Sequence, residues 1–103
     1  MTYLLGHRAI TVDRHVVVAG GELDMNAAPE LKAAINEAID EGTTTLVVDL
    51  SGVTFIDSTA IGVLMATRER LRRSGGALEL ICGDPNVLRV LEIVGMEAVV
   101  GTR

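Results

Sequence analysis

The chain has 103 residues, the length of one ordinary domain, which excludes a multidomain machine and a large barrel enzyme. Hydrophobic residues make up 49% of it and charged residues 22%, so the composition fits neither a disordered nor a fibrous chain. Its net charge is −5, and it has one Phe, one Tyr and no Trp. It lacks the positive field and the stacking side chains of nucleic-acid binders, so we expect no nucleic acid among its partners.

Thiol chemistry and membrane insertion are also limited by the sequence. Cys82 is the single cysteine, so an intramolecular disulfide is excluded and a cysteine-based zinc site would have one ligand at most. Apolar runs such as residues 60–66 fall far short of the roughly 18 residues of a membrane-spanning helix. The N-terminal residues lack the basic start and the long apolar stretch of a secretory signal. We expect a cytoplasmic protein that does not enter a membrane.

An antiparallel hairpin is the first structure that the sequence predicts. Residues 9–12 and 16–19 are rich in β-forming side chains, and a polar break at residues 13–15 separates them. Gly20 and Gly21 then end the second strand. This order places the hairpin before every predicted helix.

The first predicted helix follows an acidic loop at residues 22–24. Asn26 is its expected N-terminal cap, Pro29 suits its first turn, and Gly42 is its stop signal. Helical spacing places four side chains on its buried face: Ala28, Leu31, Ile35 and Ala38.

The second half of the chain alternates strands and helices. Leu46-Val47-Val48, within residues 43–50, is a continuous apolar run, typical of a strand buried on both faces. A helix is predicted to begin near Asp57 or Ser58 and to end before Gly75, and its inward side chains are Ile61, Leu64, Met65 and Leu71. A strand follows at residues 77–82. The last predicted helix is opened by Asp84 and Pro85 and closed by Gly95, with Val87, Leu88, Leu91 and Ile93 or Val94 inward, and a short strand follows at residues 99–100.

This order predicts an α/β domain with a mixed β-sheet, an N-terminal antiparallel hairpin, and helices packed on the sheet. In such sheets, sites gather beyond the carboxyl ends of the strands, where helix N-termini also point. Residues 21–26 and 49–59 are the two junctions expected there. The four arginines near the end of the second predicted helix are interpreted as its solvated last turn: Arg68, Arg70, Arg72 and Arg73.

The sequence lacks the common enzymatic motifs. Lys32 is the sole lysine and does not belong to a phosphate-binding loop, and the residues around Ser58 lack the glycines of a nucleophile elbow. His7 and His15 both lie in the predicted hairpin and are interpreted as surface or strand histidines rather than general bases. No ligand spacing indicates a metal site, and a hydrolase using Ser58 is improbable because no base is placed near it.

Asp57-Ser58-Thr59 stands where a helix begins, and two interpretations remain. Capping is the simpler one, because each of these side chains can accept hydrogen bonds from the first N–H groups of a helix. Capping needs one such residue, however, and the segment supplies three beside a second acidic loop at Glu22 and Asp24. This excess of polar groups favours a surface that a partner recognises.

Two segments resemble a known family. Residues 49–61, Asp-Leu-Ser-Gly-Val-Thr-Phe-Ile-Asp-Ser-Thr-Ala-Ile, and the upstream Gly-Glu-Leu-Asp at residues 21–24 resemble the STAS-domain anti-sigma factor antagonists of bacteria. Both motifs occur at the family's interval, and the element order agrees over nearly all of the chain. The resemblance implies a single STAS domain over residues 1–103.

The resemblance implies a partner-switching regulator and not an enzyme. In that family the unphosphorylated antagonist binds an anti-sigma factor that is a serine kinase, which releases the sigma factor, and phosphorylation reverses the binding. A metal-dependent serine phosphatase resets the switch. The kinase uses ATP, so no cofactor or metal is implied for this chain. The phosphoacceptor falls on Ser58, with Thr59 as second choice, and the implied partner-binding residues are Glu22, Asp24, Asp57, Ser58, Thr59 and Ile61.

The sequence departs from the family in two places. Ala60 stands where the family often has glycine, and crowding at this position is expected to slow phosphorylation while favouring the helix. The sequence ends at residues 101–103, where relatives usually continue into a final helix. We therefore expect either a shortened chain or an apolar face covered by self-association into a homodimer.

Two other functions stay open at this point. One is a STAS accessory subunit that binds a transporter ATPase or another assembly without a phosphorylation switch, with Ser58 as an interface or capping residue. The other is a module that binds a small molecule or nucleotide at the two loops.

Overall fold

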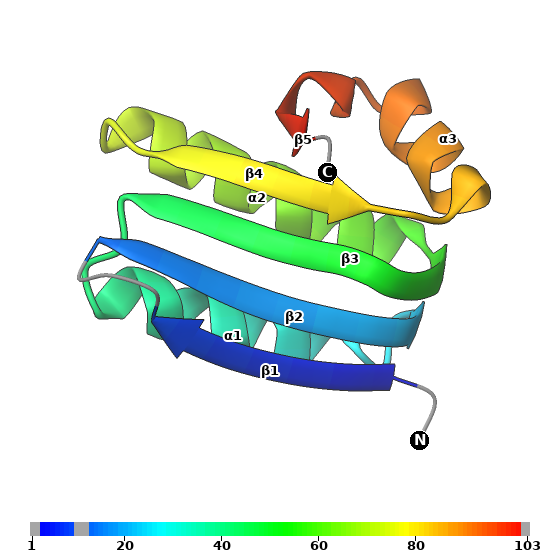
Figure 1. The fold of residues 1–103 in the computed structure, drawn as a ribbon, viewed down its shortest axis with the longest axis horizontal. Helices are drawn as coiled ribbons and strands as arrows, with labels where there is room; N and C mark the ends of the chain where they lie inside the picture. The colour runs from blue at the N-terminus through cyan, green and yellow to red at the C-terminus, as the bar shows by residue number, and fades with distance from the viewer. Residues whose placement is uncertain (1–2, 10–12, 102–103) are drawn as a thin grey trace.

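Five strands in the described part of the chain form one sheet, ordered β1 to β5 as in the sequence (Figure 1). The computed structural model describes residues 3–9 and 13–101, and within residues 3–9 it describes the backbone and Gly6. The elements are β1 (Tyr3–Ala9), β2 (Arg14–Leu23), α1 (Ala28–Asp40), β3 (Thr45–Ile56), α2 (Ser58–Arg73), β4 (Ala77–Cys82), α3 (Pro85–Ile93), the short 3-10 helix η1 (Glu97–Val99) and β5 (Val100–Gly101).

The strand pairing corrects the predicted fold class. β2, β3, β4 and β5 pair in parallel, so these four strands contain no antiparallel hairpin. The strand antiparallel to β2 is β1, whose Ala9 pairs with His15. The predicted hairpin of residues 9–12 with 16–19 is therefore wrong, because the supposed break at residues 13–15 includes the start of β2. Residues 10–12 lie outside the described residues.

Burial of residues 15–17 of β2 on both faces of the sheet explains this error. Val16 is 8% exposed, Val17 is 0% exposed, and His15 before them is 2% exposed. A continuous apolar run of this kind is typical of an interior strand of a parallel sheet, whereas a surface hairpin alternates apolar and polar side chains. The run at residues 16–19 thus marks an interior strand, with β1 on one side and β3 on the other.

β3 is longer than predicted and carries the chain to the candidate site. It continues through the polar pair Ser51-Gly52 to Ile56, because its parallel pairing with β2 also continues, with Gly20 opposite Gly52 and Leu23 opposite Ile56. The register shifts on either side of Gly21, whose φ of 79° suits glycine. β2 and β3 consequently end side by side.

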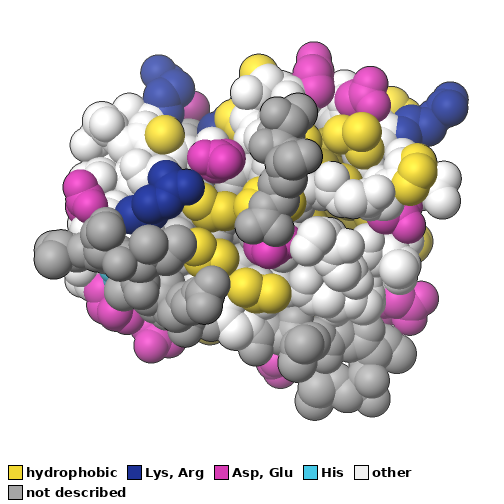
Figure 2. Space-filling view, viewed as in Figure 1, with side chains coloured by type: hydrophobic (Ala, Val, Ile, Leu, Met, Phe, Trp, Pro, Cys, Tyr) yellow, Lys and Arg dark blue, Asp and Glu magenta, His cyan; other side chains and the backbone are white. Residues whose placement is uncertain are grey.

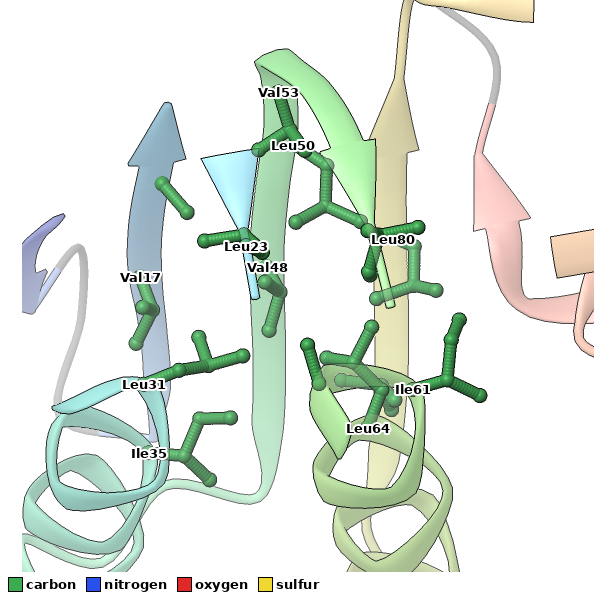
Figure 3. Packing of buried hydrophobic residues seen from close by; sticks show 14 of the residues in the cluster. Val17, Leu23, Leu31, Ile35, Val48, Leu50, Val53, Ile61, Leu64 and Leu80 are labelled. Carbon is green, nitrogen blue, oxygen red and sulfur yellow. The ribbon is translucent and has the colours of Figure 1, made fainter. Parts of the chain in front are cut away.

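α1 and α2 cover one face of the sheet and form the main core (Figures 1 and 3). The predicted buried face of α1 is confirmed at all four positions. In Figure 3, Leu31 and Ile35 of α1 and Leu64 of α2 point towards Val17 and Val48 of the sheet. Each fully buried leucine stabilises this packing by roughly 2 kcal/mol.

One predicted inward side chain of α2 faces solvent instead: Met65 is 40% exposed, so its predicted inward position is wrong. At the end of α3 the sequence offered Ile93 or Val94, and it is Val94 that packs against the core, while Ile93 is 73% exposed. Thr67 takes an inward position on α2, and it can do so because its hydroxyl donates to the carbonyl oxygen of Val63 at 2.7 Å. Helical periodicity alone favoured the apolar Met65 over this polar residue.

The opposite face of the sheet carries apolar side chains among charged ones (Figure 2). Since side chains alternate along a strand, Val16 and Val18 of β2 point away from the buried Val17. Val18 is 37% exposed. Arg14 and Glu79 form an ion pair of 3.8 Å between their side chains, both of which are about two-fifths exposed, and screening by water keeps its contribution to stability small.

Candidate functional site

The two polar segments singled out in the sequence meet at the ends of β2 and β3. Glu22 pairs with Phe55 and Leu23 with Ile56, and the backbone N–H of Asp57 donates to the carbonyl oxygen of Leu23 at 3.0 Å. The acidic loop after β2 therefore lies beside the start of α2. We call Glu22, Asp24, Asp57, Ser58 and Thr59 the Ser58 surface.

Asp57, and not Ser58, caps α2. Its backbone is extended, and its carboxylate accepts a hydrogen bond from the backbone N–H of Ala60 at 3.1 Å. Ser58 is the first residue of the helix; its side chain is exposed, and no described residue forms a hydrogen bond with its hydroxyl. The structure therefore removes the capping interpretation for Ser58 and leaves an accessible hydroxyl at a helix N-terminus.

Thr59 and Ile61 lie in different surroundings. Thr59 is exposed beside Ser58 and lines a groove between α1 and α2. Ile61 is 5% exposed and belongs to the core cluster (Figure 3). The structure thus brings Thr59 to the Ser58 surface and places Ile61 beneath it, where the isoleucine supports α2.

Asp24 holds the turn that leads into α1. Its carboxylate accepts hydrogen bonds from the backbone N–H groups of Asn26 at 2.9 Å and Ala27 at 3.3 Å. The predicted cap at Asn26 is wrong, since Ala27 occupies the cap position and no side chain caps it. An Asx-type turn at Asp24 satisfies these backbone donors before the helix begins. The prediction looked for a capping side chain directly beside the helix and therefore missed this turn.

The Ser58 surface carries three acidic side chains. Glu22, Asp24 and Asp57 form no ion pair with a Lys, Arg or His in the part of the chain that the structure describes. Glu22 is exposed and the other two carboxylates are partly exposed. A partner that docks here is favoured if it presents cationic groups.

Two exposed apolar side chains flank the Ser58 surface, and the sequence analysis missed both. Met25 follows Asp24 and is 67% exposed; Phe55 pairs with Glu22 and is 48% exposed. Phe55 also lines a small hollow of about 90 Å³ with Asn86 and Val90 of α3. Alternation along β3 could have revealed Phe55, because a residue next to the buried Ile56 points to the other face.

A larger groove runs between α1 and α2. It holds about 350 Å³ and is lined by Lys32, Asn36, Ile39, Thr59, Gly62, Val63, Ala66, Thr67 and Arg70. Arg70 donates to the side-chain oxygen of Asn36 at 2.9 Å and so bridges the two helices. The groove shares Thr59 with the Ser58 surface.

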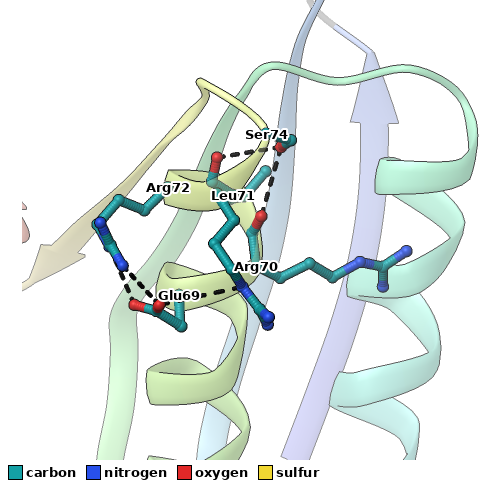
Figure 4. Close-up of polar contacts among 6 residues, drawn as sticks. Glu69, Arg70, Leu71, Arg72 and Ser74 are labelled. Atoms are coloured by element: carbon teal, nitrogen blue, oxygen red, sulfur yellow. Dashed lines mark hydrogen bonds and ion pairs between the residues drawn. The ribbon is translucent and has the colours of Figure 1, made fainter.

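Arg70, Arg72 and Arg73 form the solvated last turn of α2, as predicted (Figure 4), whereas Arg68 precedes this turn and donates to the carbonyl oxygen of Gly95 at 3.2 Å. Arg72 donates to Glu69 through Nε at 3.0 Å and through a terminal nitrogen at 2.6 Å, and this hydrogen bonding lowers the pKa of Glu69. Ser74 donates to the carbonyl oxygen of Leu71 at 3.0 Å. These contacts end the helix at the opposite end from Ser58.

The other candidate groups are placed apart from Ser58. His15 is buried in β2, and the side chain of His7 lies outside the described residues. Burial raises the pKa of the Cys82 thiol, which keeps it protonated and weakly nucleophilic at neutral pH. Among residues 3–9 and 13–101, no cluster of His, Cys, Asp and Glu suits a metal ion, and no helix has the length and hydropathy to cross a bilayer.

Comparisons with known proteins converge on one family. The family model of the STAS domain matches residues 8–103. An anti-sigma-B factor antagonist from Staphylococcus aureus is 31% identical over 81 residues, which cover 79% of this chain and 75% of the relative.

Solved structures show the same fold. The anti-sigma factor antagonist SpoIIAA in its unphosphorylated form superposes with a TM-score of 0.86 at 24% identity, covering 95% of this chain and 86% of that one. The Bacillus cell fate determinant SpoIIAA in its phosphorylated form gives a TM-score of 0.79 at 24% identity, covering 95% and 89%.

Proposed function

The chain belongs to the STAS domain family and, within it, to the anti-sigma factor antagonists; on this premise we propose that it works through Ser58. In the unphosphorylated form it binds an anti-sigma factor that is a serine kinase, and the sigma factor is released. Phosphorylation of Ser58 by that kinase ends the binding. A metal-dependent serine phosphatase restores the hydroxyl.

The observation that carries this proposal is the accessible Ser58 hydroxyl beside an Asp57 that already caps the helix. In the transfer step, the Ser58 oxygen forms a bond to the γ-phosphorus of ATP while the bond to the β-phosphate oxygen breaks. The hydroxyl proton passes to a base of the kinase, and ADP leaves. The chain is the substrate of this reaction and supplies no catalytic group.

The fold tolerates the phosphate for a physical reason. A phosphoserine carries a charge of about −1.5 to −2, and a helix N-terminus favours an anion through its dipole and its free N–H groups. Ser58 is the first residue of α2, so the added charge lies at this favourable end. We therefore place the effect of phosphorylation on the partner and not on the fold.

The docked partner does not tolerate the phosphate. The new charge joins the carboxylates of Glu22, Asp24 and Asp57, which lack cationic partners among the described residues. In an interface whose cationic groups already pair with these carboxylates the phosphate is buried unpaired, which costs roughly 2 to 5 kcal/mol. At about 1.4 kcal/mol for each factor of ten, the middle of that range weakens binding by about two orders of magnitude.

Phosphorylation by the anti-sigma factor kinase of the same organism tests the proposal. We expect the purified kinase and ATP to add one phosphate to the wild-type chain, measured by intact mass and located by peptide mass spectrometry. Ser58→Ala should take up none and should still form the complex with the kinase. Thr59→Ala, the matched control, should be phosphorylated like the wild type. Phosphate incorporated into Ser58→Ala would refute the assignment.

A further inference from the structure

The groove between α1 and α2 is open above the side chains of α2, which we call its floor. The packing of the fold does not require this open space. Thr59, Gly62, Val63, Ala66, Thr67 and Arg70 line its α2 side at helical spacing. Lys32, Asn36 and Ile39 line its α1 side. The bridge from Arg70 to Asn36 crosses the groove, and Thr59 lies at the start of α2, next to Ser58.

Gly62 is the informative residue on this floor. It lies inside α2 with an ordinary helical backbone, and a Cβ added there would meet nothing within 4 Å outside the helix's own neighbouring backbone. Glycine destabilises a helix interior relative to alanine, so neither backbone conformation nor internal crowding accounts for it. The glycine leaves this part of the groove open to a group from outside the chain.

Lys32 gives the groove a charge opposite to that of the Ser58 surface. It is the only lysine of the chain, it is exposed, and it forms no ion pair with any described residue. It lies one helical turn before Asn36, towards the N-terminal end of α1. Arg70, in contrast, already contacts Asn36 and lies 3.9 Å from Asp40.

We propose that this groove is a second docking site for the same kinase, filled by an apolar side chain of the kinase with an acidic side chain beside it. The apolar group packs over Gly62 and Ala66, and the carboxylate pairs with Lys32. A kinase that reaches the Ser58 hydroxyl covers Thr59, and therefore the mouth of the groove. Cationic groups of the kinase against the Ser58 surface, and an anionic group of the kinase against Lys32, fix the orientation of the docked kinase. The inference rests on the proposed function.

The test measures affinity for the purified anti-sigma factor kinase of the same organism by calorimetry, with ADP present so that no phosphate is transferred. Gly62→Leu fills the groove, and we expect it to weaken binding at least about tenfold without lowering the melting temperature. Its matched control is Ala33→Leu, at an exposed position of α1 outside the groove, which should change affinity by less than about twofold.

Charge is tested by a second pair of variants. Lys32→Glu should also weaken binding at least about tenfold, whereas Arg89→Glu, the same charge reversal at an exposed position on α3, should change it less than about twofold. Lys32→Arg should restore binding. The unique Lys32 amine should also become protected from acylation in the complex, while the N-terminal amine serves as internal reference.

The outcomes separate the two proposals. Wild-type chain that neither binds the kinase nor accepts phosphate would overturn the proposed function, and the groove assignment with it. Wild-type binding together with wild-type affinity of a folded Gly62→Leu would overturn the groove assignment alone. If Gly62→Leu does not fold, unchanged affinity of Lys32→Glu would likewise overturn the groove assignment.

Discussion

The carboxylate of Asp57 accepts a hydrogen bond from the backbone N–H of Ala60, with 3.1 Å between nitrogen and oxygen, so the residue before Ser58 stabilises the first turn of α2. The contribution to helix stability and the proposed signalling role therefore belong to two adjacent residues. Asp57 satisfies a backbone donor of the helix, while the Ser58 hydroxyl has no hydrogen-bond partner among the described residues. Substitutions at the two positions should consequently have different effects.

Asp57→Ala should destabilise the fold. Loss of an N-terminal cap lowers the free energy of unfolding by about 1 kcal/mol, which lowers the melting temperature of a domain of this size by roughly 4 to 8 °C. Thermal denaturation followed by circular dichroism measures the shift. Ser58→Ala is the neighbouring control and should melt within about 2 °C of the wild type. Equal destabilisation by both variants would contradict the assignment of the cap to Asp57.

Charge at Ser58 should affect stability with a definite sign. Ser58→Glu places an anion in the first turn of α2, where the helix dipole stabilises it by about 0.3 to 1 kcal/mol. Ser58→Lys places a cation there and should lower stability by a similar amount. Urea denaturation of both variants at low salt gives the difference. A Ser58→Glu variant that is less stable than the wild type would show that the fold does not tolerate an anion at this position.

Phe55 and Met25 should contribute to partner binding through their apolar surface. Both are exposed beside the Ser58 surface, and fully burying a Phe or Met side chain is favourable by about 1.5 to 3 kcal/mol. Phe55→Ser and Met25→Ser should each weaken binding to the anti-sigma factor kinase about fivefold or more. Ile93→Ser is the matched control, because Ile93 is also exposed but lies on α3. Equal losses in all three variants would argue against specific contacts at Phe55 and Met25.

Cys82 should react slowly with alkylating reagents near neutral pH. Burial raises the pKa of its thiol, so the reactive thiolate is scarcer than in an unfolded chain at the same pH. Because the folded pKa is the higher one, the stability linked to this group is complete below the unfolded pKa and decreases as pH rises through the folded pKa. Alkylation rates of the native and urea-unfolded chain across alkaline pH measure the first effect, and urea denaturation at the same pH values measures the second. A native rate equal to the unfolded rate would contradict the shift.

Local patterns in the sequence predicted much of the scaffold. The buried face of α1 is confirmed residue by residue, β4 has the bounds that were predicted, and Asp84 caps α3 through the N–H groups of Asn86 and Val87. These features depend on spacing within one element. Helical periodicity and cap chemistry are visible in a single segment and need no knowledge of the neighbours.

The errors concern properties that neighbouring elements decide. β3 continues past Ser51 because β2 pairs with it, and this pairing could not be seen in residues 51–54 themselves, of which Val53 alone is a buried apolar residue. The strand that pairs with β2 on its outer side is β1 at residues 3–9, whereas the first strand was predicted at residues 9–12. Ile61 was placed on the partner surface by motif position, but the core beneath α2 contains it.

In the candidate site, too, local features could be predicted, whereas features that depend on packing between elements could not. The position of Asp57, Ser58 and Thr59 at the start of a helix could be predicted, because their order is a local signal. The groove could not, since Lys32 and Thr59 lie far apart in the sequence and line one hollow only after α1 and α2 pack side by side. The exposure of Met25 likewise depends on the turn that Asp24 forms.

Comparing the two phosphorylation states of this chain tests the central claim most directly. The chain is phosphorylated at Ser58, purified, and titrated into the anti-sigma factor kinase beside the unphosphorylated chain. We predict that the phosphorylated chain binds about a hundredfold more weakly while its circular dichroism spectrum is unchanged. Equal affinity of the two forms would contradict the account.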